Sequence, residues 1–519
     1  MAKFKQFIWN GILITLVSLL IRTVSVSFNV YLSNRVGAVA MGLFTLISTV
    51  YGFAITVATS GIGLATTRLV AEAMGGSDTQ DGRCGAWDNP HVICTVKKCS
   101  VYALCFSLGS GLILFLFAPT IGIRLLHDER TVLSLQILAF TLPPIALSSV
   151  LGGYFVAVRR VYKNAVVQVL GQILRIYGCV FFIGFFGARD VEGACVAVVL
   201  GGALSEGVSF LTQYLLYRVE KRKYTPRKLP SAQKKKIEKK ILHTALPVAF
   251  SAYVRSGLVT IEHMLIPWGL ERSGSSRDGS LASYGVVHSM VFPLVLFPSA
   301  LSGSFAGLLV PEVAESVATG DGNRVVRIIE RVYHAVLVFA IGCAGIMICF
   351  SHELGNIIYP ETGAGAYILM IAPLVPIMYL DTSTDSILKG MGEQVFCMGV
   401  NIVDSLLSVI LVWILLPTCG INGYIITVYF TEIVNATLSI YRLFLVSRVR
   451  MRLMAWVVKP LLAIVGSTLL MRLILKYFHA CIDSPWQLGA HILLTAIFYF
   501  LLLLLTRSLK VRDLLARVK

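Results

Sequence analysis

Long apolar runs separated by short polar segments form the dominant pattern along the chain. A run of about 20 apolar residues crosses the hydrocarbon core of a bilayer as an α-helix, because each residue adds about 1.5 Å of length. The pattern predicts about 14 transmembrane helices and therefore an all-α polytopic membrane protein. The predicted spans lie near residues 7–32, 38–63, 98–118, 131–157, 164–186, 192–217, 242–267, 284–310, 332–350, 366–388, 395–416, 421–446, 459–479 and 488–506.

The composition excludes a soluble protein and the charge distribution orients the chain. Hydrophobic residues make up 56% and charged residues 14% of the sequence, whereas soluble domains carry about 25% charged residues. Of the 45 Lys and Arg residues, 34 fall on the side that holds both termini, 8 on the other side and 3 inside spans. This bias follows the positive-inside rule. We predict a multi-pass protein of a bacterial cytoplasmic membrane with both termini in the cytoplasm, and no nucleic-acid partner.

A basic linker and a weak internal repeat predict two lobes. Eleven basic residues lie in the stretch 218–240, which we expect to contact anionic membrane lipids. Gly42 and Gly285 occupy similar sequence contexts, and Glu72 and Glu315 follow at the same offset of 243 residues. A parallel repeat of six helices implies a pseudo-two-fold axis along the membrane normal. The predicted regions are an N-lobe of six helices (1–217), a cytoplasmic linker (218–241), a C-lobe of six helices (242–447) and two further helices with a tail (448–519).

Single arginines inside otherwise apolar spans are the first candidate functional residues. Arg22 lies in the first span and Arg255 at a similar depth in the seventh. A guanidinium at the bilayer centre costs about 3 kcal/mol on insertion scales, so it is expected to face a bundle interior or a watery cavity. Both halves of the chain therefore place a cation at the predicted midplane.

Four stretches resemble a known family of transporters. They are NRVGAVAMGLFTLISTVYGFAITVATSGIGLATTRLVAEAM (34–74), SSVLGGYFVAVRR (148–160), VVQVLGQILRI (166–176) and ILKGMGEQ (387–394). They are similar to the stage V sporulation protein B branch of polysaccharide and lipid flippases, which belongs to the multidrug, oligosaccharidyl-lipid and polysaccharide exporter superfamily together with the lipid II flippase. Ala157 departs from the family pattern, in which many members have a second glycine, and 75–97 resembles an insertion.

The resemblance implies transport and gives the arginines a role. It implies that two lobes alternate to move an anionic polyprenyl-diphosphate-linked saccharide, such as a lipid II-like cell-wall precursor, driven by membrane potential or a cation gradient. Guanidinium groups bind phosphate oxygens bidentately. Structural pairing with Glu206 or Glu262, or snorkelling towards the interface, is the alternative reading of these arginines. The predicted substrate-binding residues are Arg22, Arg255 and Arg175 within spans, and Arg68 and Arg35 at the two faces.

Intramembrane polar residues of the second half form a candidate cation site. Side chains three or four residues apart share one helix face, and oxygen ligands suit sodium or a proton relay. Coupling-cation sites between spans 7, 11 and 12 are known in the family, and a similar set occurs here. Interhelical hydrogen bonding is the alternative, and Asp381 and Asp385 are assigned to the bend of span 10. The predicted cation-binding residues are Glu262, Asn401, Asp404, Thr427 and Thr431.

Metal binding and enzymatic chemistry have little support in the sequence. Cys84, His91, Cys94 and Cys99 offer zinc-type ligands but lack a close Cys-x-x-Cys pair, so a solvated cytoplasmic loop is the preferred reading of 75–97. The sequence holds no GxxxxGK[ST], G-x-S-x-G or HExxH motif. We therefore expect no enzyme and no cofactor beyond a coupling sodium ion or proton.

Three alternative functions follow from the same sequence. A cation-coupled multidrug exporter requires an acidic, aromatic cavity, which the arginines disfavour. A membrane glycosyltransferase or ligase acting on polyprenyl-linked glycans requires an essential acid or arginine in a large external loop, and the predicted external loops are short. A non-transporting scaffold would tolerate neutralised arginines. We expect a monomer whose substrate partner is a lipid-linked oligosaccharide.

Overall fold

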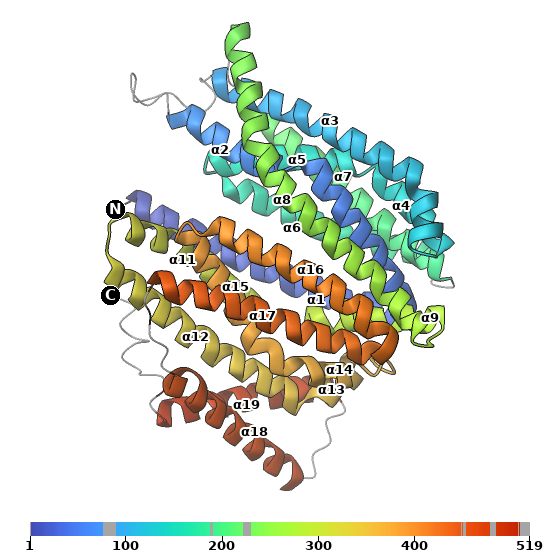
Figure 1. The fold of residues 1–519 in the computed structure, drawn as a ribbon, viewed down its shortest axis with the longest axis vertical. Helices are drawn as coiled ribbons and strands as arrows, with labels where there is room; N and C mark the ends of the chain where they lie inside the picture. Colours follow the sequence, from blue (N-terminus) through green and yellow to red (C-terminus); the bar gives the residue numbers. More distant parts are fainter. Residues whose placement is uncertain are drawn as a thin grey trace. The chain divides into compact units, whose positions relative to one another are not determined.

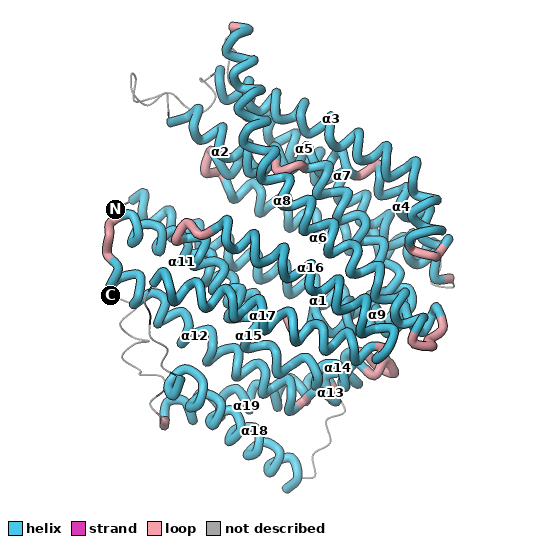
Figure 2. The backbone as a smooth tube through the Cα atoms, in the orientation of Figure 1, coloured by secondary structure: helices cyan, strands magenta, loops and turns pink. Residues whose placement is uncertain are grey.

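The computed structural model describes residues 2–75, 90–186, 190–221, 230–447, 449, 453–477, 484–506 and 508. Within these ranges the chain forms helices joined by short turns, and no strand occurs there (Figures 1 and 2). The α-helices are α1 (Ala2–Thr59), α2 (Ile62–Gly75), α3 (Pro90–Thr120), α4 (Val132–Ala139), α5 (Leu142–Ala157), α6 (Val161–Phe186), α7 (Val191–Lys221), α8 (Ser231–Arg272), α9 (Arg277–Gly285), α10 (Phe292–Val295), α11 (Ser299–Ala318), α12 (Gly322–Cys349), α13 (Ser351–Ile358), α14 (Ala364–Ile371), α15 (Val375–Gly390), α16 (Gln394–Cys419), α17 (Ile421–Ser447), α18 (Lys459–Tyr477) and α19 (Pro485–Leu505).

The predicted polytopic membrane fold is confirmed. Among the described residues, 11 helices are long and apolar enough to cross a membrane, or 12 if one bent pair counts as a single span. One of them, Leu19–Met74, covers the second half of the predicted span 7–32 and the whole of the predicted span 38–63. The 58 residues of α1 would measure about 87 Å if straight, far more than a bilayer core of about 30 Å. Gly37 interrupts them with φ 84° and ψ 169°, so α1 is two helices that meet there. The count of 14 stays a prediction.

Prolines divide two of the predicted spans into shorter helices. The predicted span 284–310 is split among α9, a π-helical stretch Val286–Val291, α10 and α11, with Pro298 at the N-terminus of α11. The predicted span 131–157 is bent by 45° between α4 and α5, where Pro143 and Pro144 begin α5. Proline lacks a backbone N–H and fits the first turn of a helix better than its interior. The apolar pattern therefore predicts the span but not its break.

The chain forms two compact units. Unit 1 comprises Met1–Phe28 and Val39–Leu265, and unit 2 comprises Asn29–Ala38 and Ile266–Lys519. The division at Leu265 falls inside α8, which is continuous from Ser231 to Arg272. The division between the two compact units therefore lies elsewhere than the predicted lobe boundary at 218–241. That boundary was inferred from the sequence repeat and stays a prediction.

The core of unit 1 holds α2, α3, α5 and the beginning of α8 together. Val70, Val92, Val150 and Phe155 are fully buried in one apolar cluster, which also includes Ile241 and Ala245 of α8. Helices α2 and α5 come close at Gly153, where an added Cβ would lie 2.5 Å from the carbonyl oxygen of Gly63. This packing fixes the first turns of α8 beside α2.

Polar contacts extend the packing of α8 along unit 1. The Tyr253 hydroxyl lies 2.6 Å from Ser60 Oγ, in the turn between α1 and α2. One turn further, the hydroxyls of Ser256 and Thr56 are 3.3 Å apart. These bonds flank Arg255 in the sequence and hold its helix against the second part of α1.

In unit 2, α18 and α19 pack beside α12 (Figure 1). The buried Tyr499 of α19 donates a hydrogen bond to the carbonyl oxygen of Val338 at 2.7 Å. Its ring occupies space that a side chain at Gly342 would need, because an added Cβ there would lie 2.6 Å from the ring. Asn34 also belongs to this unit and donates to the carbonyl oxygen of Ile358 at 2.9 Å.

Candidate functional site

A groove of about 820 Å³ lies between α2 and the first turns of α8 in unit 1. Five of its lining side chains are basic or can become cationic, and one is acidic. We call it the basic groove. Its polar lining residues are Arg68, Glu72, Lys236, Lys239, Lys240 and His243, and its apolar ones include Leu69, Leu242, Leu246 and Pro247.

The helical period of α8 explains why its lysines line the groove. Ile237, Ile241 and Ala245 recur every four residues, and all three pack on the core of unit 1. Residues at this spacing share one face of a helix. Lys236, Lys239, Lys240 and His243 fall outside that apolar stripe and stay exposed next to α2. Burial of the apolar stripe therefore leaves the basic side chains of α8 exposed as a cationic surface.

Glu72 is the counter-charge inside the basic groove. Its Oε1 accepts a hydrogen bond from Arg68 Nε at 3.1 Å, one helical turn away on α2. Its Oε2 accepts from Lys240 Nζ at 3.3 Å. The Arg68, Lys240 and Glu72 side chains are 66%, 56% and 43% exposed, so water screens both pairs. One carboxylate balances only part of the positive charge, and a second anion such as a phosphate can bind the rest.

Two other ion-pair groups at this end of unit 1 are structural. Lys98 of α3 pairs with Glu238 of α8, which does not line the groove. Glu220 of α7 is almost buried and pairs with Lys163 and, at 2.5 Å, with Arg160 Nη1. The hydrogen bond to the Glu220 carboxylate raises the pKa of Arg160, because it stabilises the protonated guanidinium. Arg160 and Lys163 are therefore committed to an internal acid.

Three of the predicted substrate arginines lie on three helices of unit 1. Arg22 is in α1, Arg175 in α6 and Arg255 in α8, and each side chain is exposed. Arg175 interacts electrostatically with Glu206 of α7 and with Tyr51. An exposed guanidinium at span depth is far more stable beside water or anions than beside lipid chains.

The two remaining predicted arginines differ in their surroundings. Arg68 lines the basic groove and pairs with Glu72. Arg35 is exposed, belongs to unit 2 and does not line the groove. The five arginines are therefore not gathered in the one groove described.

Three of the predicted cation ligands of unit 2 donate hydrogen bonds to backbone carbonyl oxygens of their own helices. Asn401 Nδ2 donates to the carbonyl oxygen of Cys397 at 2.6 Å. The Thr427 and Thr431 hydroxyls donate to the carbonyl oxygens of Gly423 at 2.9 Å and Val428 at 3.4 Å. Their oxygen lone pairs remain as acceptors. Glu262 belongs to unit 1, so the predicted set spans both units.

Another group of acids comes together on α15, α16 and α17, and we call it the acid cluster. Asp381 interacts electrostatically with Asp404 and with Glu432. Asp381 Oδ2 accepts a hydrogen bond from Asn435 at 3.1 Å, and its Oδ1 is a buried atom without a hydrogen-bond partner. Sequence reasoning assigned Asp381 to a bend and missed Glu432 and Asn435. Their spacing of three residues within α17, next to Thr431, was the available signal.

The metal candidates are not brought together by the described part of the chain. Cys84 lies outside the described residues, whereas His91, Cys94 and Cys99 lie on α3, with Cys99 in the core of unit 1. No group of three or more His, Cys, Asp or Glu residues in the described ranges is arranged to hold a metal ion. The prediction of a solvated loop over 75–97 is wrong for its last residues, because α3 begins at Pro90.

Comparisons of sequence relate the chain to a polysaccharide biosynthesis protein family and to sporulation proteins. The profile of a family described as polysaccharide biosynthesis protein matches residues 7–271, about half of the 519 residues. The chain is 24% identical to stage V sporulation protein B of Bacillus subtilis (strain 168) over 426 residues, which cover 81% of this chain and 80% of that protein. It is 18% identical to sporulation protein YkvU of the same organism, over 75% of this chain and 83% of that protein.

Comparisons of structure support the transporter fold. The lipid II flippase MurJ in an inward closed conformation matches with a TM-score of 0.69 at 14% identity, covering 96% of this chain and 99% of that one. An inward-facing multidrug resistance transporter of the MATE family and MOP superfamily matches with a TM-score of 0.56 at 18% identity, covering 84% and 97%. At these identities the likeness concerns the fold.

Proposed function

Because the chain belongs to the polysaccharide biosynthesis protein family, we propose that it translocates an anionic polyprenyl-diphosphate-linked saccharide across the bacterial cytoplasmic membrane. It is a multi-pass transporter of the flippase type and not an enzyme, as its relatives and its helical fold indicate. We further propose that both termini are cytoplasmic, that the chain works as a monomer, and that the substrate is a lipid-linked oligosaccharide.

The basic groove is the observation that carries the proposal. It offers Arg68 and three lysines against the single carboxylate of Glu72. A diphosphate presents several charged oxygens, which guanidinium binds bidentately and ammonium binds as a point charge. Exposed apolar side chains such as Leu242 and Leu246 line the same groove. The groove therefore suits an anionic group attached to a lipid, and in the proposed orientation it receives the substrate from the cytoplasm.

The exposed arginines of unit 1 supply a path for the diphosphate beyond the groove. Arg22, Arg175 and Arg255 sit within spans, where a cation needs an anionic or aqueous partner. Arg35 takes the equivalent role near the opposite face in this proposal. Because each guanidinium stays protonated in a partly dry site, the anion moves from one cation to the next as the lobes alternate.

In this proposal the acid cluster of unit 2 binds the cation that is coupled to transport. Asp381, Asp404 and Glu432 place several carboxyl groups close together in helices that span the membrane. A sodium ion or protons relieve the repulsion among them. Thr427, Thr431 and Asn401 contribute further oxygens from the same helices. Exchange of this cation, or the membrane potential acting on the anionic substrate, drives transport.

Reconstituted transport tests the proposal. A fluorescent polyprenyl-diphosphate saccharide is placed in proteoliposomes, and its movement between leaflets is followed with and without sodium. We expect the wild type to move the lipid and Arg22→Ala, Arg255→Ala and the double variant to lose most of the rate at equal protein content. Arg160→Ala is the control, because Arg160 pairs with Glu220. If the wild type does not transport the diphosphate lipid but extrudes organic cations, the protein is a multidrug exporter.

A further inference from the structure

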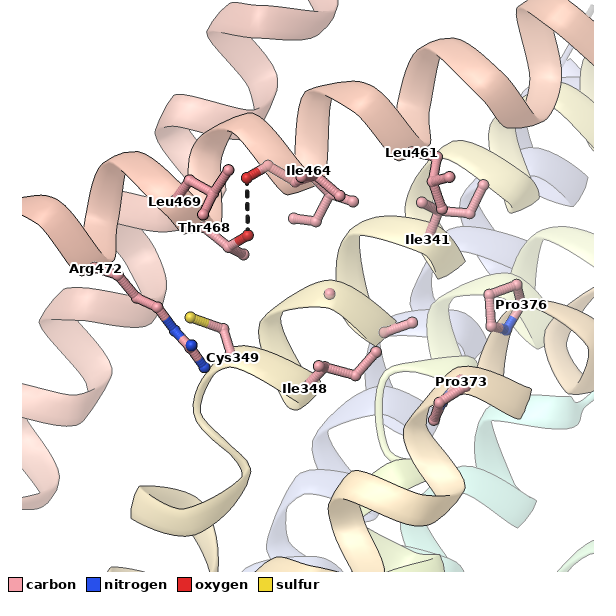
Figure 3. Close-up of a pocket in the computed structure, with 13 residues that line it drawn as sticks. Ile341, Ile348, Cys349, Pro373, Pro376, Leu461, Ile464, Thr468, Leu469 and Arg472 are labelled. Atoms are coloured by element: carbon pink, nitrogen blue, oxygen red, sulfur yellow. Dashed lines mark hydrogen bonds between the residues drawn. The ribbon is translucent and has the colours of Figure 1, made fainter.

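A cavity of about 410 Å³ lies in unit 2 between α12, α18 and the beginning of α15 (Figure 3). Its walls are mostly apolar, formed by side chains such as Ile341 and Ile348 of α12 and Leu461 and Ile464 of α18. Both helices are long and apolar enough to cross a membrane. The volume falls within the range of about 300–1,000 Å³ that is typical of small-molecule sites.

One end of this cavity carries a cation. Arg472 extends from α18 beside the Cys349 thiol at the end of α12 (Figure 3). Its side chain is exposed and hydrogen-bonds the Cys349 thiol, and among the described residues no carboxylate forms an ion pair with it. The nearby Thr468 hydroxyl donates to the carbonyl oxygen of Val465 at 3.0 Å. The Arg472 guanidinium therefore keeps several N–H donors available at the mouth of an apolar cavity.

Backbone geometry on two sides keeps the cavity open. Helices α12 and α18 touch at Gly345, where an added Cβ would lie 2.2 Å from Ile464 Cγ1. On the opposite wall, Pro373 lies in a 3-10 turn, Ala372–Leu374, and Pro376 lies in the first turn of α15. These close contacts and rigid prolines limit the movement of the helices toward one another.

We propose that this cavity binds one acyl chain of an anionic phospholipid of the bilayer, with the lipid phosphate held by Arg472. An apolar cavity offers water too few hydrogen-bond partners, so hydrocarbon fills it more favourably than water. A guanidinium without a carboxylate partner binds phosphate through paired N–H donors. The site uses a resident membrane lipid and is independent of the transported substrate. It secures α18 to α12 and so attaches the last helices to unit 2.

Lipid retention by the purified full chain tests this site. The protein is equilibrated in detergent with phosphatidylglycerol and phosphatidylcholine of identical acyl chains, and native mass spectrometry measures the bound lipids. We expect the wild type to retain phosphatidylglycerol preferentially. Arg472→Leu is expected to lower the ratio of the two bound lipids by about tenfold, whereas Arg472→Lys keeps part of the preference. Thr468→Phe fills the cavity and is expected to lose both lipids.

Lys476→Leu is the matched control. Lys476 is also basic and exposed, lies one helical turn beyond Arg472 and does not line the cavity. We expect it to retain lipid like the wild type. Equal losses in Lys476→Leu and Arg472→Leu would overturn the proposal, because general surface charge then explains binding. Unchanged retention in a folded Thr468→Phe, checked by size-exclusion chromatography, or a polyprenyl diphosphate as the retained molecule, would also overturn it.

Discussion

The Glu72 carboxylate on α2 accepts a hydrogen bond from the Lys240 ammonium on α8 at 3.3 Å, across 168 residues of sequence. The same carboxylate pairs with Arg68. An acid in the middle of a cationic groove occupies the donors that an incoming phosphate needs. Glu72 is thus an internal competitor of the proposed substrate, and its pairs are weak enough for an anion to replace.

Glu72→Gln is expected to increase anion affinity at the basic groove. Neutral Gln frees Arg68 and Lys240, and an exposed ion pair contributes about 0.2–1 kcal/mol, so the Kd for inorganic pyrophosphate should fall by a factor of about 1.4 to 5. The measurement is isothermal titration with the full chain in nanodiscs of zwitterionic lipid. Glu238→Gln serves as control, because Glu238 pairs with Lys98 outside the groove. Equal effects of both changes would assign the gain to net charge alone.

Removing groove lysines is expected to weaken the same binding. Lys236→Ala combined with Lys239→Ala should raise the Kd for pyrophosphate about tenfold, because each exposed charge contributes up to about 1 kcal/mol. It should also reduce the dependence of binding on salt, because fewer charges are screened. Lys221→Ala removes an exposed lysine that does not line the groove and should leave the Kd unchanged. A double variant that binds like the wild type would place the anion elsewhere.

Gly153→Ala tests the close packing of α2 and α5. A Cβ at this position would lie 2.5 Å from the Gly63 carbonyl oxygen, so the helices must move apart at a cost of about 1–3 kcal/mol. Thermal unfolding in detergent should show a lower Tm. Gly109→Ala on α3 is the comparison, because nothing lies within 4 Å of its added Cβ. We expect its Tm to be equal or slightly higher, and equal losses in both variants would contradict the packing described.

Asp381→Asn tests the acid cluster as the coupling site. Asp381 interacts with Asp404 and Glu432, so neutralising it should abolish the sodium or proton dependence of transport while substrate binding persists. Glu393→Gln is the control, because Glu393 pairs with Arg442 at 2.9 Å and does not act on Asp381. The measurement is the transport rate in proteoliposomes under opposed cation gradients. If Asp381→Asn keeps the full cation dependence of transport, the acid cluster is not the coupling site.

The sequence pattern predicted the helices better than their interruptions. Apolar runs reveal which segments suit a membrane. They did not indicate that α8 begins at Ser231, inside the predicted linker 218–241, where the stripe of Ile237, Ile241 and Ala245 leaves a cationic face beside it. The apolar pattern does not show that α1 breaks at Gly37, and the prolines within the predicted span 284–310 mark a possible break without showing how the span divides. Those outcomes depend on backbone conformation and on neighbouring helices.

The candidate site was only partly predictable for a similar reason. Arg68 was identified from its position at a helix end, but its partner Glu72 also contacts Lys240, and that contact exists only in the folded chain. Likewise, Glu432 gains its significance from Asp381 and Asp404 on neighbouring helices. Spacing within one helix indicates a shared face, whereas a site built from several helices requires their packing.

The most direct test of the central claim compares two fluorescent polyprenyl lipids in the same proteoliposomes, one with a diphosphate-linked saccharide and one with the same saccharide on an uncharged linkage. The account predicts that the wild type translocates the diphosphate lipid at least about tenfold faster, since charge-assisted hydrogen bonds contribute about 1.5–3 kcal/mol. It also predicts that Arg22→Ala/Arg255→Ala removes this difference. Equal translocation of both lipids by the wild type would contradict the account, because anion recognition would then play no part in transport.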